Sequence, residues 1–207
     1  MANQEISEQE REAIRFLEQD YGECYEQLRL MDNQIVEIIK FLLSMYVSII
    51  GVAIGLSNFL GEAKYDFMAP VKISLLTVFI IGIFILWFVL QRRVYYVKTA
   101  RYLNEQRKLF FSFKPLGFSN LSRMHVDINQ ETLQWQSSHL ILTYIIATLN
   151  GILIGTLLFI SLTGSNKIVL SFLVTLVVIF AQILAEGIYL HNKDVKNRKK
   201  DQKKDGE

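Results

Sequence analysis

The sequence predicts an all-α polytopic membrane protein, with four transmembrane helices in two hairpins and a helical, partly coiled-coil cytoplasmic layer. Three observations predict this fold class. Hydrophobic residues make up 51% of the 207 residues, and they gather in four blocks that contain no charged side chain. The blocks come in two pairs, each joined by a short connector. The segment before the first block repeats apolar residues at alternating spacings of three and four.

Residues 1–40 are expected to form a cytoplasmic amphipathic helix that is continuous with the first span. Its apolar seam contains Leu17, Tyr21, Cys24, Leu28, Met31, Ile35 and Ile38. A sustained period of 3.5 residues is typical of coiled-coil packing, so the seam needs a partner helix. That partner is either a second copy of the chain or its own middle segment. Charge favours the middle segment, because residues 1–40 hold ten acidic and four basic side chains, whereas residues 91–139 hold eight basic and three acidic.

The four apolar blocks define two transmembrane hairpins, residues 41–90 and 140–190. The blocks are Phe41–Leu60, Ile73–Leu90, Leu140–Leu162 and Ile168–Ala185. Each is long enough to cross a hydrocarbon core about 30 Å thick as a helix. Four such blocks in so short a chain leave too few residues to cover them from water, so a membrane is the expected environment.

Two glycine pairs, Gly51 with Gly55 and Gly151 with Gly155, occur in the first spans of the two hairpins. Glycines four residues apart share one helix face and let a neighbouring backbone approach closely. We therefore predict that both pairs are helix-packing faces, either between the hairpins or between chains. Asn150 adjoins the second pair near mid-span, and we expect it to form an interhelical hydrogen bond.

The segment between the hairpins, residues 91–139, is expected to be cytoplasmic, basic and helical. Pro115 and Gly117 should interrupt its first helix, and Asp127 or Asn129 should cap a second helix that leads into the third span. The tail, residues 191–207, is highly charged and is predicted to be disordered.

Lysine and arginine set the expected orientation. Residues 1–40, 91–139 and 191–207 hold four, eight and seven of these side chains, and only Lys64, Lys72 and Lys167 lie in the two hairpin connectors. The positive-inside rule then predicts cytoplasmic N- and C-termini. The expected location is an integral membrane, which is the inner (plasma) membrane if the chain is bacterial.

The sequence contains no recognisable catalytic motif, and we predict no catalytic, cofactor-binding or metal-binding residue. The three histidines are far apart and lack metal-ligand spacing. Glu186 is the ionisable residue nearest the interior of a span, which by default makes it a functional candidate. It lies at the depth of Arg92 and Arg93, so an interfacial ion pair or plain solvation is a simpler expectation than a proton or ion site.

These features predict a non-enzymatic homo-oligomer whose partner is the lipid bilayer, without nucleic acid. One hypothesis is a pore-forming or membrane-perturbing effector that is controlled through its cytoplasmic helices. The alternative is a membrane scaffold or accessory subunit that recruits a cytoplasmic protein partner. An apolar, multi-pass sequence is compatible with either class.

Overall fold

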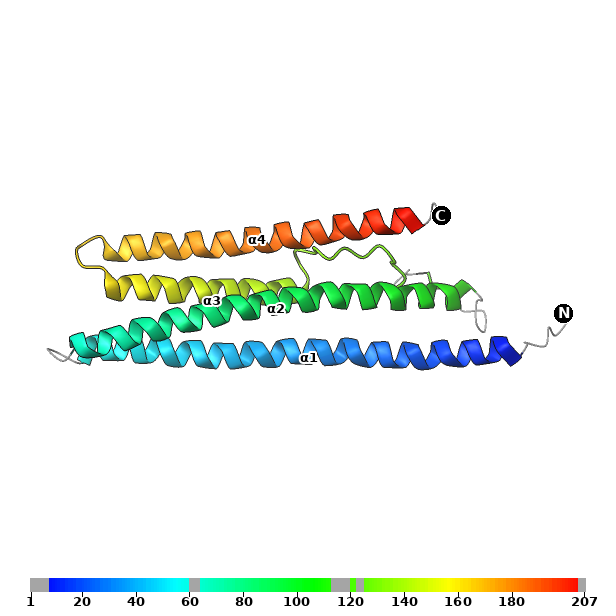
Figure 1. Ribbon diagram of the computed structural model, residues 1–207, viewed down its shortest axis with the longest axis horizontal. Coiled ribbons are helices and arrows are strands. Elements are labelled where there is room, and N and C mark those ends of the chain that lie inside the picture. The colour runs from blue at the N-terminus through cyan, green and yellow to red at the C-terminus, as the bar shows by residue number, and fades with distance from the viewer. Residues whose placement is uncertain (1–7, 60–63, 113–119, 122–124, 205–207) are drawn as a thin grey trace. The chain divides into compact units, whose positions relative to one another are not determined.

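The structure is a computed structural model, and it describes residues 8–59, 64–112, 120–121 and 125–204. It has four helices: α1 (Glu8–Phe59), α2 (Lys64–Ser112), α3 (Ser138–Ser161) and α4 (Lys167–Lys204). No strand occurs within these described ranges. Each helix contains a stretch that is long and apolar enough to cross a membrane. The prediction of an all-helical chain with four such helices is therefore confirmed (Figure 1).

The chain divides into two compact units, which are described separately. The first unit contains Met1–Gln34 and Tyr95–Glu131, and the second contains Ile35–Val94 and Thr132–Glu207. Because α1 and α2 are long, each of them contributes residues to both units. The second unit includes all four apolar blocks, whereas the first is formed by the charged ends of α1 and α2 with a short irregular segment.

The second unit has a hydrophobic core contributed by α1, α2 and α3. It contains Ile35, Ile39, Leu42, Tyr46 and Ala53 from α1, Val71, Leu75, Val78, Leu86 and Val89 from α2, and Ile146 and Leu153 from α3. On each helix these residues recur at the spacing of one face, which explains why that face is buried. Helix α4 packs alongside α3, after a five-residue connection (Figure 1).

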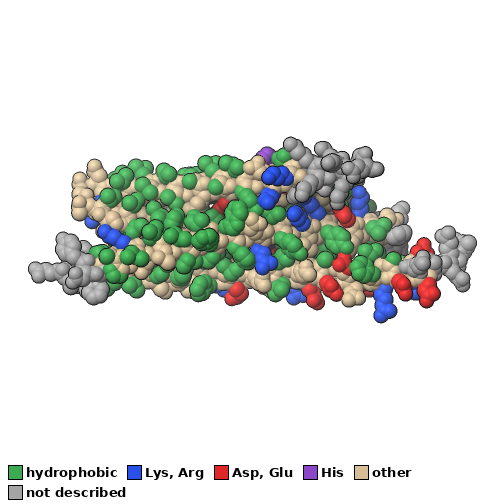
Figure 2. All heavy atoms as spheres, in the orientation of Figure 1, with side chains coloured by type: hydrophobic (Ala, Val, Ile, Leu, Met, Phe, Trp, Pro, Cys, Tyr) green, Lys and Arg blue, Asp and Glu red, His purple; other side chains and the backbone are tan. Residues whose placement is uncertain are grey.

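The outer surface of α4 is apolar and exposed within the single chain. Only 6% of its most apolar stretch is buried, compared with 44% for α3. Phe172, Val177, Phe180 and Leu184 are each more than half exposed, and Figure 2 shows hydrophobic side chains along this helix. Exposed apolar surface on this scale is stable in lipid and not in water.

The first unit is held by polar contacts between α1 and α2. The Asp20 carboxylate accepts hydrogen bonds from Tyr102 (2.6 Å) and Gln106 (2.9 Å). The Arg107 guanidinium donates to the Tyr21 hydroxyl at 2.7 Å and lies over the same ring. In this unit the seam positions Leu17, Tyr21, Cys24 and Leu28 are half-buried, and Met31 is buried.

The seam continues in the second unit, where Ile35 is buried and Ile38 is half-buried. Both belong to the core formed with α2 and α3 or pack against it. The apolar period of α1 therefore marks one face that is half-buried from Leu17 and mostly buried from Met31, although Ile14 near its start is 45% exposed.

One expectation about an irregular segment, the helix cap at Asp127 or Asn129, is corrected. Asp127 does not cap a helix: its carboxylate accepts from the Asn129 backbone N–H in a turn, and α3 begins only at Ser138. The Ser137 side chain is the N-cap of α3 and accepts from the Leu140 N–H, since a serine hydroxyl satisfies a free amide of the first turn. The predicted interruption at Pro115 and Gly117 lies outside the described residues.

The C-terminal segment also differs from the expectation of disorder from residue 191. Helix α4 continues without a break to Lys204. The physical reason lies at Asp194, whose buried carboxylate accepts hydrogen bonds from the backbone N–H groups of Thr132 and Leu133 and from the Thr132 hydroxyl. This tertiary contact holds the helix beyond the apolar block, which composition alone does not reveal.

Candidate functional site: a buried polar cluster in the membrane helices

A chain of hydrogen bonds links three helices within their apolar stretches. The Tyr46 hydroxyl of α1 donates to Asn150 Oδ1 of α3 at 2.6 Å, and Asn150 Nδ2 donates to Gln182 Oε1 of α4 at 2.8 Å. Tyr46 and Asn150 are fully buried, and Gln182 is 9% exposed. Such bonds stabilise helix association in lipid by about 0.6 kcal/mol each on average. The Asn150 amide thus fixes α3 to two neighbours at once.

Helix α2 approaches the Tyr46–Asn150 hydrogen bond at Gly82. A Cβ atom added there would overlap the Tyr46 hydroxyl oxygen and Asn150 Oδ1. The absence of a side chain is therefore what lets the Tyr46–Asn150 hydrogen bond form directly against the backbone of α2. With Gly82 included, all four helices contribute to this cluster.

A second polar group lies one helical turn further along α4. Glu186, four residues after Gln182, is 2% exposed. Its Oε2 is 2.7 Å from the Thr143 hydroxyl of α3, and Thr143 is also 2.8 Å from the Leu140 carbonyl oxygen. Its other oxygen, Oε1, has no hydrogen-bond partner among the residues that the structure describes.

More buried polar atoms of α3 and α4 lack hydrogen-bond partners among the described residues. They include Gln182 Nε2, the Tyr144 hydroxyl and the Tyr189 hydroxyl. Gln182, Glu186 and Tyr189 occupy positions i, i+4 and i+7 of α4 and so share one face. Tyr144 and Tyr189 both pack on the small apolar cluster that includes Leu140 and Leu190. The result is a strip of unsatisfied polar groups within an apolar helix pair.

The expected ion pair between Glu186 and Arg92 or Arg93 is not formed within the described part of the chain, where the three side chains have other contacts. The Arg92 guanidinium lies over the Phe88 ring, with 4.9 Å to its centroid. Arg93 is buried and donates to the Thr132 carbonyl oxygen at 3.2 Å. Glu186 instead contacts Thr143, because it lies on the face of α4 that packs on α3.

The two glycine pairs differ in their surroundings. A Cβ at Gly151 would lie 2.5 Å from Ile179 Cγ1 and 3.0 Å from the Thr175 carbonyl oxygen of α4, and one at Gly155 would overlap the Thr175 hydroxyl. At Gly51 and Gly55 an added Cβ meets no described atom within 4 Å. The second pair is therefore in close contact inside the chain, whereas packing by the first pair stays a prediction about another molecule.

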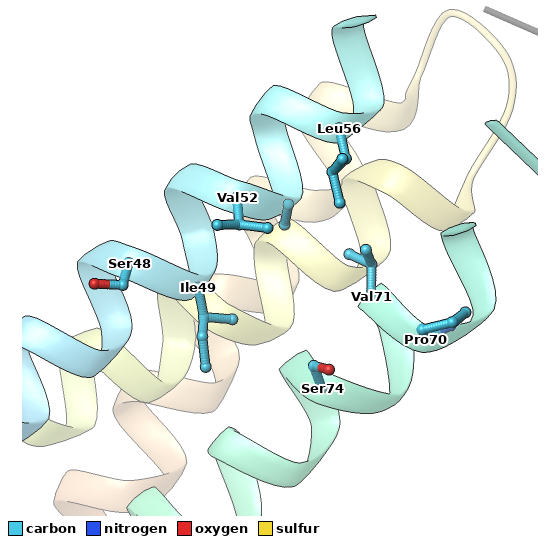
Figure 3. A pocket seen from close by; sticks show the side chains of 8 residues that line it. Ser48, Ile49, Val52, Leu56, Pro70, Val71 and Ser74 are labelled. Atoms are coloured by element: carbon cyan, nitrogen blue, oxygen red, sulfur yellow. The ribbon is translucent and has the colours of Figure 1, made fainter. Parts of the chain in front are cut away.

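A groove of about 300 Å³ lies between α1 and α2 next to the first glycine pair (Figure 3). It is lined by Ser48, Ile49, Val52, Ala53, Leu56, Pro70, Val71 and Ser74. Figure 3 shows Val52 and Leu56 of α1 on one side and Val71 of α2 on the other. Its lining is almost wholly apolar, which suits a hydrocarbon chain or a side chain of another helix.

Sequence reasoning identified Asn150 and Glu186 but missed the residues that complete the cluster. Tyr46 and Thr143 look like ordinary members of apolar spans, and Gly82 lacks a second glycine four residues away. The available signal was a polar residue within each of the third and fourth apolar blocks or at its end, Asn150 and Glu186. The partner of each polar group depends on how the helices are rotated against one another, and the sequence period does not determine that rotation.

Comparison with protein-family models, curated proteins and solved structures gives no match to this chain. The functional argument therefore depends on the residues and contacts described above.

Proposed function

We propose that this chain is an oligomeric multi-pass membrane protein that forms a pore or perturbs the membrane and is controlled through its cytoplasmic helices. The observation that carries the proposal is the contrast between the two glycine pairs. Gly151 and Gly155 are in close contact with α4 of the same chain, whereas an added Cβ at Gly51 or Gly55 meets no described atom within 4 Å. In lipid an open small-residue face is typical of a contact between helices of different chains.

The open face extends beyond the two glycines. Ser44, Ser48, Gly51 and Gly55 follow one another at spacings of four, three and four, so they lie on one side of α1. The Ser48 hydroxyl donates to the Ser44 carbonyl oxygen at 2.8 Å, so it is satisfied within its own helix. Neighbouring Val52 is 59% exposed. A second helix can approach this face closely without leaving a polar group unpaired.

The groove beside this face supports a second copy of the chain as the occupant. A helix of a second copy that packs closely on Gly51 and Gly55 would place some of its side chains in this groove, whose lining is apolar. Repetition of such a contact around a closed ring would enclose a central space, which is the simplest route from this surface to a pore.

The proposed arrangement in the membrane has two hairpins, with both termini cytoplasmic. The lysine and arginine distribution supports this orientation. The short connection between α3 and α4, together with their packing, supports the second hairpin. On this view the charged ends of α1 and α2 form a cytoplasmic layer that includes the coiled-coil seam. The contacts of Asp20 and Tyr21 with α2 support a partner within the same chain.

A second candidate function is a scaffold that recruits a cytoplasmic protein. The observation that favours it is the exposed apolar surface of the first unit, where Phe16 is 67%, Leu30 58% and Tyr25 46% exposed. Exposed apolar side chains on an otherwise charged helix are a common feature of protein-binding surfaces. A stoichiometric cytoplasmic protein that co-purifies, and is lost in Phe16→Ala with Leu30→Ala, would support this function.

Reconstitution into liposomes tests the first proposal. The parent protein should run as an oligomer in mild detergent and release an entrapped ion. Gly51→Leu with Gly55→Leu should reduce both the oligomer size and the flux, because two bulky side chains block the close approach. Val177→Leu, on the exposed surface of α4, is the matched control and should change neither property.

The results separate the parts of the proposal. An unchanged oligomer in the glycine double variant would rule out this face as the interface. An oligomeric parent that releases no entrapped ion from detergent-free liposomes would reject the pore. The scaffold would then be the better hypothesis.

A further inference from the structure

Thr143 has one hydroxyl hydrogen and two oxygen neighbours. The Leu140 carbonyl oxygen is 2.8 Å away and Glu186 Oε2 is 2.7 Å away. If Glu186 were ionised, both neighbours would be pure acceptors, and one hydrogen would have to serve two short contacts. If Glu186 carries a proton, its O–H donates to Thr143 Oγ, and Thr143 donates to Leu140. Both distances are then ordinary hydrogen bonds.

The surroundings of the carboxyl group also favour the neutral form. Glu186 is 2% exposed, and Oε1 has no partner among the described residues. An ionised carboxylate there would keep at most one shared hydrogen bond. Removing a charge from water without a pairing cation costs more than such a bond returns.

None of the titratable groups on the elements packed against Glu186 compensates such a charge. Helix α3 contributes His139 and Tyr144, and α4 itself contributes Tyr189. From α2, Arg93 donates to the Thr132 carbonyl oxygen. Within the described residues, none of these groups is within hydrogen-bond or ion-pair distance of Glu186, whose one such contact is Thr143.

The other charged groups at that end of the helices also have contacts elsewhere. Arg92 of α2 lies over Phe88, and Asp194, two turns further along α4, accepts from Thr132. On α3 and α4, Gln182 Nε2 and the Tyr144 and Tyr189 hydroxyls are neutral polar atoms without a hydrogen bond to any described residue.

We propose that Glu186 is a proton-binding site inside the helix bundle of the second unit, with Thr143 as the acceptor of its proton. The ligand is a single proton, which the folded protein holds at neutral pH. Release of that proton leaves a charge that the closed α3–α4 contact cannot solvate. The strip of Gln182, Tyr144 and Tyr189 is where water would have to enter to stabilise it.

Infrared spectroscopy of the full-length protein in lipid nanodiscs tests this proposal directly. At pH 7 the parent should show the carbonyl stretching band of a protonated carboxylic acid. The band should be absent in Glu186→Gln, retained in Asp194→Asn, and lost from the parent as the pH is raised. A parent spectrum that matches Glu186→Gln in this region at pH 7 would overturn the proposal.

Thermal stability gives a second readout. Glutamine has nearly the shape of the neutral acid, and its amide N–H can donate to Thr143 Oγ as the acid O–H does. We therefore expect Glu186→Gln to melt at the parent's temperature at pH 7, and Glu186→Ala to melt lower. A Glu186→Gln protein that melts as low as Glu186→Ala would contradict the proposal.

A measurement on the parent alone covers the case in which the variants do not fold. A hydrophobic carbodiimide reacts with a protonated carboxyl group: the acid proton moves to a carbodiimide nitrogen, and the carboxyl oxygen bonds to the central carbon. The adduct then rearranges to a stable N-acylurea without losing any atom. Peptide mass spectrometry should find this adduct at Glu186, in an amount that falls as pH rises. No adduct, or an amount independent of pH, would refute the site.

Discussion

Replacement of Gly82 by alanine is the smallest change that should disrupt the polar cluster. The added methyl group would overlap the Tyr46 hydroxyl oxygen and Asn150 Oδ1 and would lie 3.1 Å from Asn150 Cγ. All three atoms belong to one buried hydrogen-bonded pair, and neither side chain is exposed. The bundle must therefore either move α2 outward or separate Tyr46 from Asn150.

The expected cost follows from these two responses. Overpacking a close-packed interior typically costs 1–3 kcal/mol. Loss of one interhelical hydrogen bond in a membrane protein costs about 0.6 kcal/mol on average, and at most about 1.7. Alanine gains up to ~1 kcal/mol over glycine from helix propensity, which offsets part of this. We expect Gly82→Ala to lower the free energy of unfolding by about 2 kcal/mol.

Reversible unfolding in mixed detergent micelles, followed by circular dichroism, measures this free energy. Gly22→Ala is the matched control, because the same methyl group at this position of α1 meets no described atom within 4 Å. It should be neutral or stabilising by up to ~1 kcal/mol. In a Tyr46→Phe background one of the overlapping atoms is gone, so Gly82→Ala should cost about 1 kcal/mol less than in the parent.

Two results would refute this reasoning. One is a Gly82→Ala protein as stable as Gly22→Ala, which would mean that α2 does not approach the cluster closely. The other is an unchanged cost of Gly82→Ala in the Tyr46→Phe background. That would mean that the Tyr46 hydroxyl is not the atom that the methyl group meets.

Three further predictions concern the ends of the helices. Asp194→Ala should destabilise the protein by about 1–3 kcal/mol, because it leaves the buried amide and hydroxyl of Thr132 unsatisfied, and limited proteolysis should then cut near that residue while the parent stays intact. In a Cys24→Ser background, a cysteine at Ser165 should react with an impermeant thiol reagent on intact cells and one at Gln136 should not; the reverse pattern would overturn the orientation inferred from the positive-inside rule. Mild oxidation of native membranes should give little covalent dimer through Cys24, because it is the only cysteine in the chain and its seam is expected to pack within one molecule; rapid, near-complete crosslinking would show pairing between chains.

The sequence by itself determined the class of the protein and the faces of its helices. Four uncharged apolar blocks predict four helices that can cross a membrane, because only a helix satisfies its own backbone groups in lipid. The seam of α1 predicts the positions that are buried, since a face repeats with the helical period whatever packs against it. These features depend on residues close together in the chain, and they are readable without a structure.

The tertiary structure decided which of these faces meet and which polar groups become partners. Gly151 and Gly55 lie in similar sequence settings, yet among the described residues Gly151 is in close contact with α4 and Gly55 meets no atom within 4 Å. Gly82 carries no motif, yet it is the position where α2 admits the Tyr46–Asn150 pair. The physical reason is that a helical period repeats every few residues, whereas the rotation and depth of one helix against another depend on contacts between residues a hundred positions apart.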